Sequence, residues 1–172
     1  MSDLQEASKR VAAAAQALGL DIGVRALAAS TRTAEEAAAA CGCAVGQIVK
    51  SLVFRGAASG KPYLLLVSGA NRVDEAGVAS AIGEGLVRPD ARFVRDATGF
   101  AIGGIPPFGH VTRLATFIAG DLLGHDVVFA AAGTPQSIFS VDPRRLADAT
   151  GATVIAVRQN PFLRRIAPST FE

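Results

Sequence analysis

Apolar and polar residues follow the helical period in some stretches of the chain and the strand period in others. Near the N-terminus, Leu4, Val11 and Leu18 are spaced as one face of a helix, and Gly19 follows them. Glycine commonly ends a helix, so the pattern predicts a first helix that stops there. Ser2 and Gln5 stand three residues apart at its start, which is the spacing of a capping box.

A second capping box precedes an alanine-rich run. Thr33 and Glu36 open this run and Gly42 closes it, which predicts a short helix. Residues 45–54 then change to β-branched and aromatic residues, which favour a strand. We therefore place Lys50 near the transition from helix to strand.

Turn residues divide the rest of the chain into short elements. Residues 62–69 form a buried-strand candidate, joined to the preceding strand through the flexible segment 56–61, which suggests a hairpin. The further predicted elements are a helix from Asp74 to Gly83, a strand at 91–94, a helical turn at 95–99, a loop at 100–110, strands at 127–131 and 137–141, a helix from Asp142 to Gly151, and a strand at 153–157.

Length and composition indicate one folded domain. The 172 residues fit a single domain, and a chain with 50% hydrophobic and 19% charged residues is not of the disordered type. The longest uncharged stretches, 97–112 and 127–141, are shorter than the roughly 18 residues needed to span a bilayer. The start of the chain has no signal-peptide pattern, so we expect a cytoplasmic protein. With a net charge of +2 and no basic tract, any contact with nucleic acid should be local.

Common catalytic and cofactor motifs are absent from the sequence. A zinc site would have only Cys41, Cys43, His110 and His125 as soft ligands, and the two cysteines are most simply small buried hydrophobes. No nucleophile elbow, phosphate loop or dinucleotide fingerprint is present. We therefore predict no metal and no cofactor.

Lys50 stands apart from the other lysines. The chain has three lysines, and Lys50 alone lies within an apolar segment. Its stem could simply run along apolar surface with the ammonium at the rim. Alternatively, an ammonium at the mouth of an apolar pocket would hold a phosphate or an ester carbonyl. The pattern favours neither interpretation.

The loop at 100–110 also has two interpretations. Clusters of glycine and proline are most often plain turns. Glycines also let a ligand approach the backbone, whose N–H groups can polarise a carbonyl. His110 at its end could act as a general base, although a surface or capping histidine is the commoner case.

Four landmarks in order carry a resemblance to a known family. Lys50-Ser51 opens a strand, LLLVSGANRVD follows at 64–74, TGFAIGGIPPFG stands at 98–109, and AGTPQSIFSVDPRRLADATGA at 132–152. This set resembles the YbaK/ProX family of free-standing aminoacyl-tRNA deacylases, which are related to the editing insertion domain of bacterial prolyl-tRNA synthetases. The resemblance covers nearly the whole chain.

The resemblance implies a fold and a domain organisation. We expect an α/β fold of the α+β type, with one curved, mostly antiparallel mixed sheet flanked by helices. A pocket should lie between the sheet and the glycine-proline loop. Residues 1–158 would form the editing domain, and residues 159–172 a C-terminal extension.

The resemblance also assigns site residues. Lys50 matches the essential lysine of the family, which we assign to positioning the terminal adenosine and its phosphate. Gly103 and Gly104 belong to the loop whose backbone should hold the ester. The residues expected to contact substrate are Ser51, Pro107, Phe108, Gly109, His110, Gly133 and Ser137. No metal ligand is implied.

The implied activity is hydrolysis of a wrongly attached amino acid from a tRNA, typically tRNA(Pro), carrying alanine or cysteine. Because an aminoacyl ester is activated, a positioned water beside polarising N–H groups can suffice. The expected partners are the tRNA acceptor end and, as a further candidate, prolyl-tRNA synthetase, with the protein a monomer or weak homodimer.

The sequence departs from the cysteine-specific members of this family at TPQSIF (134–139) and IPPFGH (105–110). Phe108, Ile138 and Phe139 would narrow a pocket that they faced, which would favour alanine. They could equally belong to the core. A non-catalytic module that binds aminoacyl-tRNA or a synthetase is the alternative function, and an esterase using His110 ranks last.

Overall fold

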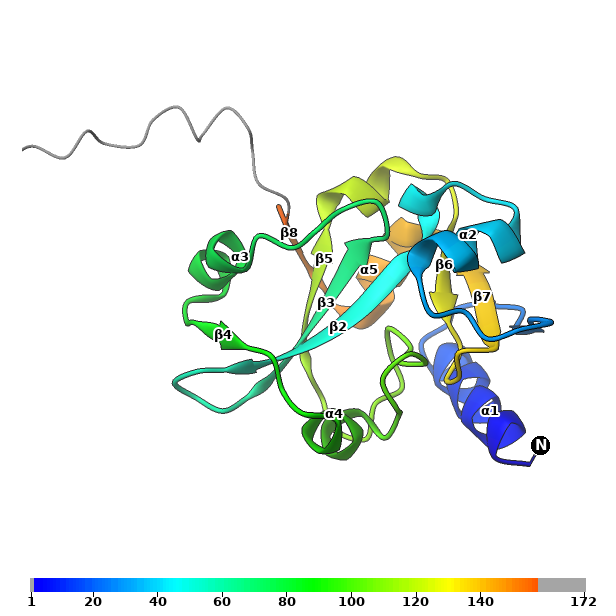
Figure 1. Ribbon diagram of the computed structural model, residues 1–172, viewed down its shortest axis with the longest axis horizontal. Helices are drawn as coiled ribbons and strands as arrows, with labels where there is room; N and C mark the ends of the chain where they lie inside the picture. Colours follow the sequence, from blue (N-terminus) through cyan, green and yellow to red (C-terminus); the bar gives the residue numbers. More distant parts are fainter. Residues whose placement is uncertain (1, 158–172) are drawn as a thin grey trace, which may run out of the picture.

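The computed structural model describes residues 2–157, with side chains from Glu6 onward. The larger of its two sheets has the order β4-β2-β3-β5-β8 (Figure 1). Strand β3 pairs antiparallel with β2 and parallel with β5, so the sheet is mixed. Its strands are β2 (Val49–Gly56), β3 (Pro62–Ser68), β4 (Leu86–Val87), β5 (Ala115–Ala119) and β8 (Thr153–Ile155).

A smaller antiparallel sheet of order β1-β7-β6 lies beside strand β2 of the larger one (Figure 1). Its strands are β1 (Arg25–Ala26), β6 (Val128–Ala131) and β7 (Ser137–Val141). One parallel bridge, between Ile48 and Phe129, connects the two sheets. The mixed α/β fold with mostly antiparallel pairing is confirmed, and its described strands form two sheets rather than one continuous sheet.

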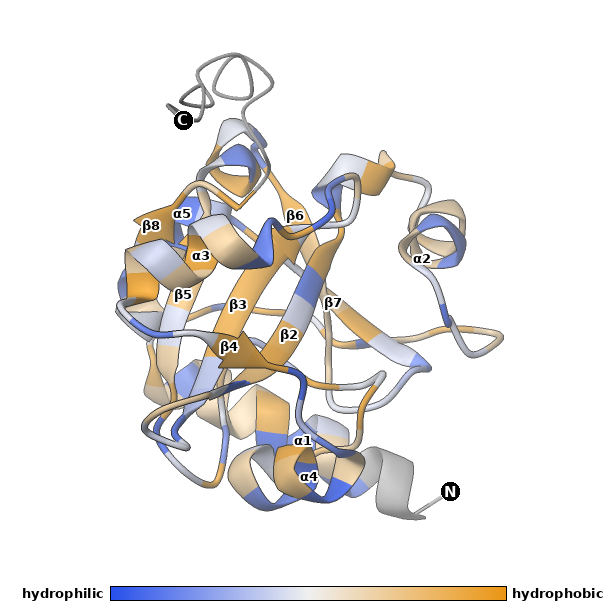
Figure 2. Cartoon of the chain, turned by 60° about the vertical axis from the view of Figure 1, so that its left-hand side comes forward, coloured by the Kyte–Doolittle hydropathy of each residue, from blue (hydrophilic) through white to orange (hydrophobic). Residues whose placement is uncertain are grey.

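Helices cover the sheets in the described part of the chain. They are α1 (Ser2–Ala17), α2 (Ala34–Cys41), α3 (Glu75–Ile82), α4 (Ala91–Thr98) and α5 (Pro143–Thr150), with 3-10 turns η1 (Val45–Gln47) and η2 (Gly120–Gly124). The central strands are mainly apolar, whereas α1 and α4 carry polar outer faces (Figure 2). Residues Leu64 to Val67 of β3 are fully buried because apolar clusters pack on both faces of this strand.

The predicted cap of the second helix is present. The Thr33 hydroxyl accepts a hydrogen bond from the Glu36 N–H at 3.1 Å, and Gly42 ends α2 with a φ of 67°. The Glu36 carboxylate accepts from the Arg32 N–H at 2.8 Å rather than from Thr33 itself. The side chains of the first predicted capping box, Ser2 and Gln5, and the predicted extension 159–172 lie outside the described residues.

The prediction of a strand at 91–94 is wrong. These residues form the first turn of α4, because the Asp90 side chain accepts a hydrogen bond from the Phe93 N–H at 2.8 Å and caps the helix. Val94 and Ala97 then bury one face of this helix. A run of four residues is too short for its period to separate a helix from a strand.

The carboxylate of Glu84 joins the β2–β3 hairpin to the segment before β4. It accepts hydrogen bonds from the N–H groups of Ala58 and Ser59 at 3.0 Å, and from the hydroxyls of Ser59 and Tyr63 at 2.6 Å. The Ser59 and Tyr63 hydroxyls, followed by the backbone donors, lower the pKa of Glu84 to about 2. One ionised side chain therefore ties the end of the hairpin to the segment before β4.

We expect Glu84→Gln to lower the stability of the protein in a pH-dependent way. The folded-state pKa lies below that of the unfolded chain, so the carboxylate stabilises the fold above about pH 4.5, and this contribution is lost as the pH falls towards 2. Urea unfolding at several pH values should show a wild-type advantage at pH 7 that shrinks below pH 4.5. Glu75→Gln, which removes a partner of Arg88 only, is the control. A wild-type advantage that stays constant with pH would contradict the assignment.

Candidate active site

A cavity of about 630 Å³ lies between the start of β2 and the turn that joins β6 to β7. Residues 30–34 and the glycine-proline loop at Ile102, Gly103 and Ile105 complete its walls. Of the sequence-predicted site residues, the structure brings Lys50, Ser51, Gly103 and Ser137 together around this space.

The cavity follows a free edge of β2. This strand pairs with β3 along its whole length, but with β4 only at Arg55 and Gly56. The N–H of Gly56 bonds back to Lys61, and Ile48 accepts from Gly69, so even-numbered residues of β2 direct their backbone groups toward β3. The N–H and C=O of Ser51 therefore point to the free edge, where a ligand can pair with them.

Lys50 presents an ammonium with one fixed partner at this edge. Its Nζ donates a hydrogen bond to the carbonyl oxygen of Asn71 at 2.6 Å. Burial lowers the pKa of Lys50, the nearby Glu35 carboxylate opposes this shift, and the Arg72 guanidinium adds to it. An ammonium has three donors, so two remain for a ligand.

The hydroxyl of Ser51 has no hydrogen-bond partner. It is the one buried side-chain oxygen or nitrogen without a partner within the described part of the chain. Leaving such a group unpaired costs roughly 1–3 kcal/mol, and native proteins contain few of them. Because Ser51 also lines the cavity, a ligand that reached this hydroxyl would supply the missing bond.

Ser137 is already engaged within the protein. Its hydroxyl shares a hydrogen bond of 2.8 Å with the Thr134 hydroxyl and donates to the Ala132 carbonyl at 3.1 Å. The Ser8 hydroxyl of α1 donates to Ser137 from outside the cavity at 3.1 Å. These bonds fix the turn between β6 and β7, so Ser137 shapes the wall more than it offers a free group.

Gly103 and Gly104 have different roles in the loop. Gly103 lines the cavity with a φ of +100°, a conformation that side chains disfavour. Gly104 does not line it, and a Cβ at this position would lie 2.6 Å from the Thr134 Cα. The absence of a side chain at Gly104 lets the loop pack directly on the β6–β7 turn.

The other predicted contact residues lie outside the cavity lining. Pro107 and Phe108 are buried, and the Phe108 ring packs on Phe139 with centroids 5.5 Å apart, so both rings belong to the core. Gly109 and Gly133 pack closely on helix α1. Of the residues proposed to narrow the pocket, only Ile138 lines it.

His110 is also directed away from the cavity. Its Nε2 lies 2.8 Å from the Pro106 carbonyl oxygen, which makes this nitrogen the donor. Burial lowers the pKa of His110, and the Pro106 hydrogen bond only partly offsets this effect. The ring is therefore neutral at pH 7, and it supports the loop instead of facing substrate.

Sequence reasoning missed the segment that forms the far wall. Ser30, Thr31, Arg32 and Thr33 all line the cavity, and the Thr31 hydroxyl donates to the Pro135 carbonyl at 3.1 Å. A run of four polar residues between alanine-rich stretches was the available signal. Thr33 had been interpreted only as a helix cap.

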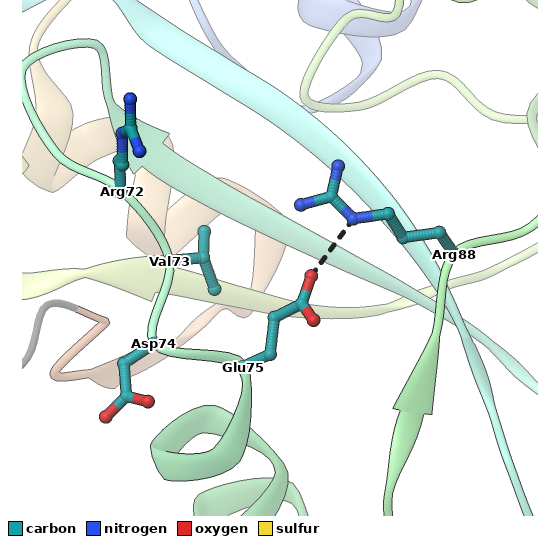
Figure 3. A pocket seen from close by; sticks show the side chains of 5 residues that line it. All are labelled: Arg72, Val73, Asp74, Glu75 and Arg88. Carbon is teal, nitrogen blue, oxygen red and sulfur yellow. Dashed lines mark hydrogen bonds and ion pairs between the residues drawn. The ribbon is translucent and has the colours of Figure 1, made fainter.

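A second hollow, of about 450 Å³, contains none of the predicted site residues. Arg72, Val73, Asp74, Glu75 and Arg88 line it (Figure 3). Arg88 Nε donates to Glu75 Oε1 at 3.1 Å, and Asp74 points away from both arginines (Figure 3). The charges of two arginines and two carboxylates cancel in this hollow. The lining of the Lys50 cavity, in contrast, has an excess of positive charge.

The structure gives no support to a metal site or a reactive thiol. Among residues 2–157, no group of three or more His, Cys, Asp or Glu side chains gathers to hold an ion. Burial raises the pKa of Cys41 and Cys43, so both are weak nucleophiles at pH 7. None of the helices described is long and apolar enough to cross a bilayer.

Comparison with known proteins identifies the family. The sequence model of the aminoacyl-tRNA editing domain matches residues 28–149, which include the whole cavity lining. The chain belongs to this family. The resemblance to YbaK-like editing domains drawn from the sequence is thereby confirmed.

Two solved structures with similar sequences share the fold. A crystal structure described as that of a candidate trans-editing enzyme for prolyl-tRNA synthetase is 46% identical, with a TM-score of 0.84 over 90% of this chain and 98% of that one. The crystal structure of hypothetical protein APE2540 is 29% identical, with a TM-score of 0.80 over 86% of this chain and 98% of that one. Uncharacterized protein YwhH of Bacillus subtilis (strain 168) is 29% identical over 119 residues, 69% of this chain and 75% of that protein.

We expect His110 to make the editing domain sensitive to mild acid. The unfolded chain takes up a proton below about pH 6.5, whereas the buried ring resists it, so stability falls as the pH drops. Thermal unfolding between pH 7.5 and 5.5 should show a smaller loss of stability for His110→Gln than for wild type. Equal losses in the two proteins would show that His110 does not carry this dependence.

Proposed function

We propose that the protein is a deacylase that hydrolyses mischarged aminoacyl-tRNA, with tRNA(Pro) carrying a small non-cognate amino acid as its substrate. Membership of the editing-domain family supports the reaction class. The 46% identical neighbour, described as a candidate trans-editing enzyme for prolyl-tRNA synthetase, supports the choice of tRNA. In this proposal the 3′-terminal adenosine and its ester occupy the cavity beside Lys50.

The single observation that carries the proposal is that Lys50, which has a half-buried ammonium, and Ser51, which has an unpartnered hydroxyl, both line one cavity. Ser51 Oγ lacks a partner, and Lys50 retains two unused donors. The ammonium would hold the terminal adenosine through its phosphate, and the Ser51 hydroxyl would bind the ester or the amino acid. A hydroxyl donor at the ester stabilises the negative charge that develops on the carbonyl oxygen when water attacks.

The reaction needs only water and the ester, which reacts at its carbonyl carbon and its ribose oxygen. The water oxygen bonds to the carbonyl carbon, the bond from that carbon to the ribose oxygen breaks, and the proton from water ends on the ribose oxygen. The two cysteines and His110 lie outside the cavity lining, so no protein base is assigned to this step. A positioned water acting on an activated ester is sufficient for such a mechanism.

The cavity wall favours a small amino acid. Ile48, Ile105, Phe129 and Ile138 supply apolar surface, and Ala131 adds a small side chain to the lining. One methylene changes binding in an apolar pocket by roughly 10–200-fold, so exclusion by size can separate a small side chain from a larger one. We assign alanine ahead of cysteine on this basis.

Replacing Lys50 should remove the activity and spare the fold. We expect Lys50→Ala to lower kcat/KM by roughly 100-fold or more, because without the ammonium the terminal adenosine and its ester are no longer positioned for attack by water. The measurement is hydrolysis of tRNA(Pro) charged in turn with alanine, cysteine, serine, threonine or proline. Lys61→Ala, which changes an exposed lysine in the β2–β3 hairpin, is the control.

Two outcomes would contradict this assignment. Unchanged turnover by Lys50→Ala would remove the role of the lysine. Binding of charged tRNA with no hydrolysis of any ester by the wild-type protein would favour the non-catalytic binding module.

Replacing Ser51 should separate activity from stability. Ser51→Ala removes a buried hydroxyl that has no partner, so the free energy of unfolding should stay the same or rise by up to about 1 kcal/mol. Turnover should fall about tenfold, because the substrate loses a hydrogen bond. Ser68→Ala provides the contrast, since the Ser68 hydroxyl donates to the Gly46 carbonyl at 2.8 Å and its loss should destabilise the fold. Full activity in Ser51→Ala would exclude Ser51 from the site.

A further inference from the structure

The ammonium of Lys50 depends on the turn that follows β3. The carbonyl of Asn71 in this turn accepts the 2.6 Å hydrogen bond from Lys50 Nζ. Within the described chain, no carboxylate forms a salt bridge with Lys50. A lysine stem is flexible, so the direction of its ammonium depends on how firmly this one acceptor is held.

A side chain from a distant segment holds that turn. Asn71 Nδ2 donates a hydrogen bond of 2.7 Å to Asp121 Oδ2, across fifty residues of sequence. The backbone of this turn is bonded at both ends, from the Gly69 N–H to the Ile48 carbonyl and from the Asp74 N–H to the Val157 carbonyl, each at 2.7 Å. Between these points the Asn71 N–H bonds locally to the Ser68 carbonyl, and the Asn71 side chain is tied to the segment after β5 by its bond to Asp121.

The topology explains why these residues meet. Strands β3 and β5 are parallel neighbours, with Leu66 opposite Ile118. The segments that follow both strands therefore lie at the same end of the sheet. Asn71 follows β3, and Asp121 follows β5 in η2. Strand β2 runs in the opposite direction and begins at this same end of the sheet, with Val49 opposite Ser68. This places Lys50 beside Asn71 and Asp121.

We propose that Asp121 is a positioning residue for Lys50, acting through the Asn71 side chain. Its carboxylate fixes the Asn71 amide, the amide fixes the turn, and the turn carbonyl fixes the ammonium of Lys50, a residue that lines the cavity. The consequence for hydrolysis rests on the proposed function, whereas the arrangement of the three residues does not. Ordering the ammonium in advance lowers the entropy cost of binding substrate.

Chemical acylation of lysine tests the arrangement directly. Lys9, Lys50 and Lys61 are the three lysines of the chain, so peptide mass spectrometry can follow each one during reaction with an N-hydroxysuccinimide ester of acetate. In Asp121→Ala, Lys50 should react about three- to tenfold faster than in wild type, which corresponds to one lost hydrogen bond. Lys9 and Lys61 serve as internal references and should not change.

Three further variants complete the experiment. Asp121→Asn keeps an oxygen acceptor for the Asn71 amide but loses the charge, so Lys50 should react as in wild type. Asn71→Ala keeps the backbone carbonyl but loses the amide donor, so it should match Asp121→Ala. Asp126→Ala removes an exposed carboxylate five residues away and should have no effect.

Two results would overturn the proposal. One is an acylation rate of Lys50 that does not change in an Asp121→Ala protein with wild-type thermal stability. If Asp121→Ala does not fold, an unchanged rate in Asn71→Ala has the same meaning. The other is an equal acceleration in Asp121→Asn and Asp121→Ala, which would attribute the effect to charge alone.

Hydrolysis supplies a separate arm. With alanyl-tRNA(Pro), Asp121→Ala should lower kcat about tenfold with little change in KM, and Asp121→Asn should restore most of it. A wild-type protein that hydrolyses nothing, but whose variants show the acylation pattern above, would overturn the proposed function and leave the role of Asp121 standing. A kcat in Asp121→Ala equal to that of an active wild type would overturn the role of Asp121 in the reaction.

Discussion

The free edge at the start of β2 is the constraint on which the site depends. A strand inside a sheet bonds on both sides, but here β4 pairs with only the last two residues of β2, and the described bridge to the smaller sheet, from Ile48 to Phe129, lies just before β2. The backbone of Ser51 is left open at a place that the protein otherwise surrounds. Exposed edges invite pairing with other chains, and enclosing this one within a cavity restricts it to a small ligand.

The directions of the strands bring charged and polar groups together where β2 begins and where β3 and β5 end. Antiparallel pairing of β2 with β3 brings the start of one strand to the end of the other, and parallel pairing of β3 with β5 adds a second strand end. Lys50, Asn71 and Asp121 meet for this reason, although they lie far apart in the sequence. The ammonium is thus held by a hydrogen bond to backbone, and none of the described carboxylates forms a salt bridge with it.

Local signals predicted the framework better than the site. Caps such as Thr33 and the turn around Gly133 act over a few residues, so the sequence located α2 and the β6–β7 pair. The site depends on contacts between distant segments, which a local pattern does not report. Phe108 illustrates the difference, because its loop position suggested a pocket residue, whereas it packs on Phe139 in the core. Short β1 and β4, of two residues each, have no periodicity to detect.

Helix α1 makes the cavity depend on a part of the chain that the family match does not include. The match begins at residue 28, yet the Ser8 hydroxyl lies within hydrogen-bond distance of both the Ala132 carbonyl, at 3.0 Å, and the Ser137 hydroxyl, at 3.1 Å, behind the cavity wall. Gly133 packs so closely on this helix that a Cβ there would lie 3.0 Å from the Ala7 carbonyl. The turn carrying Thr134 is therefore clamped between α1 and Gly104 of the loop. Because a wall held from both sides cannot move outward easily, the size of the cavity is set by packing behind it as well as by the residues that line it.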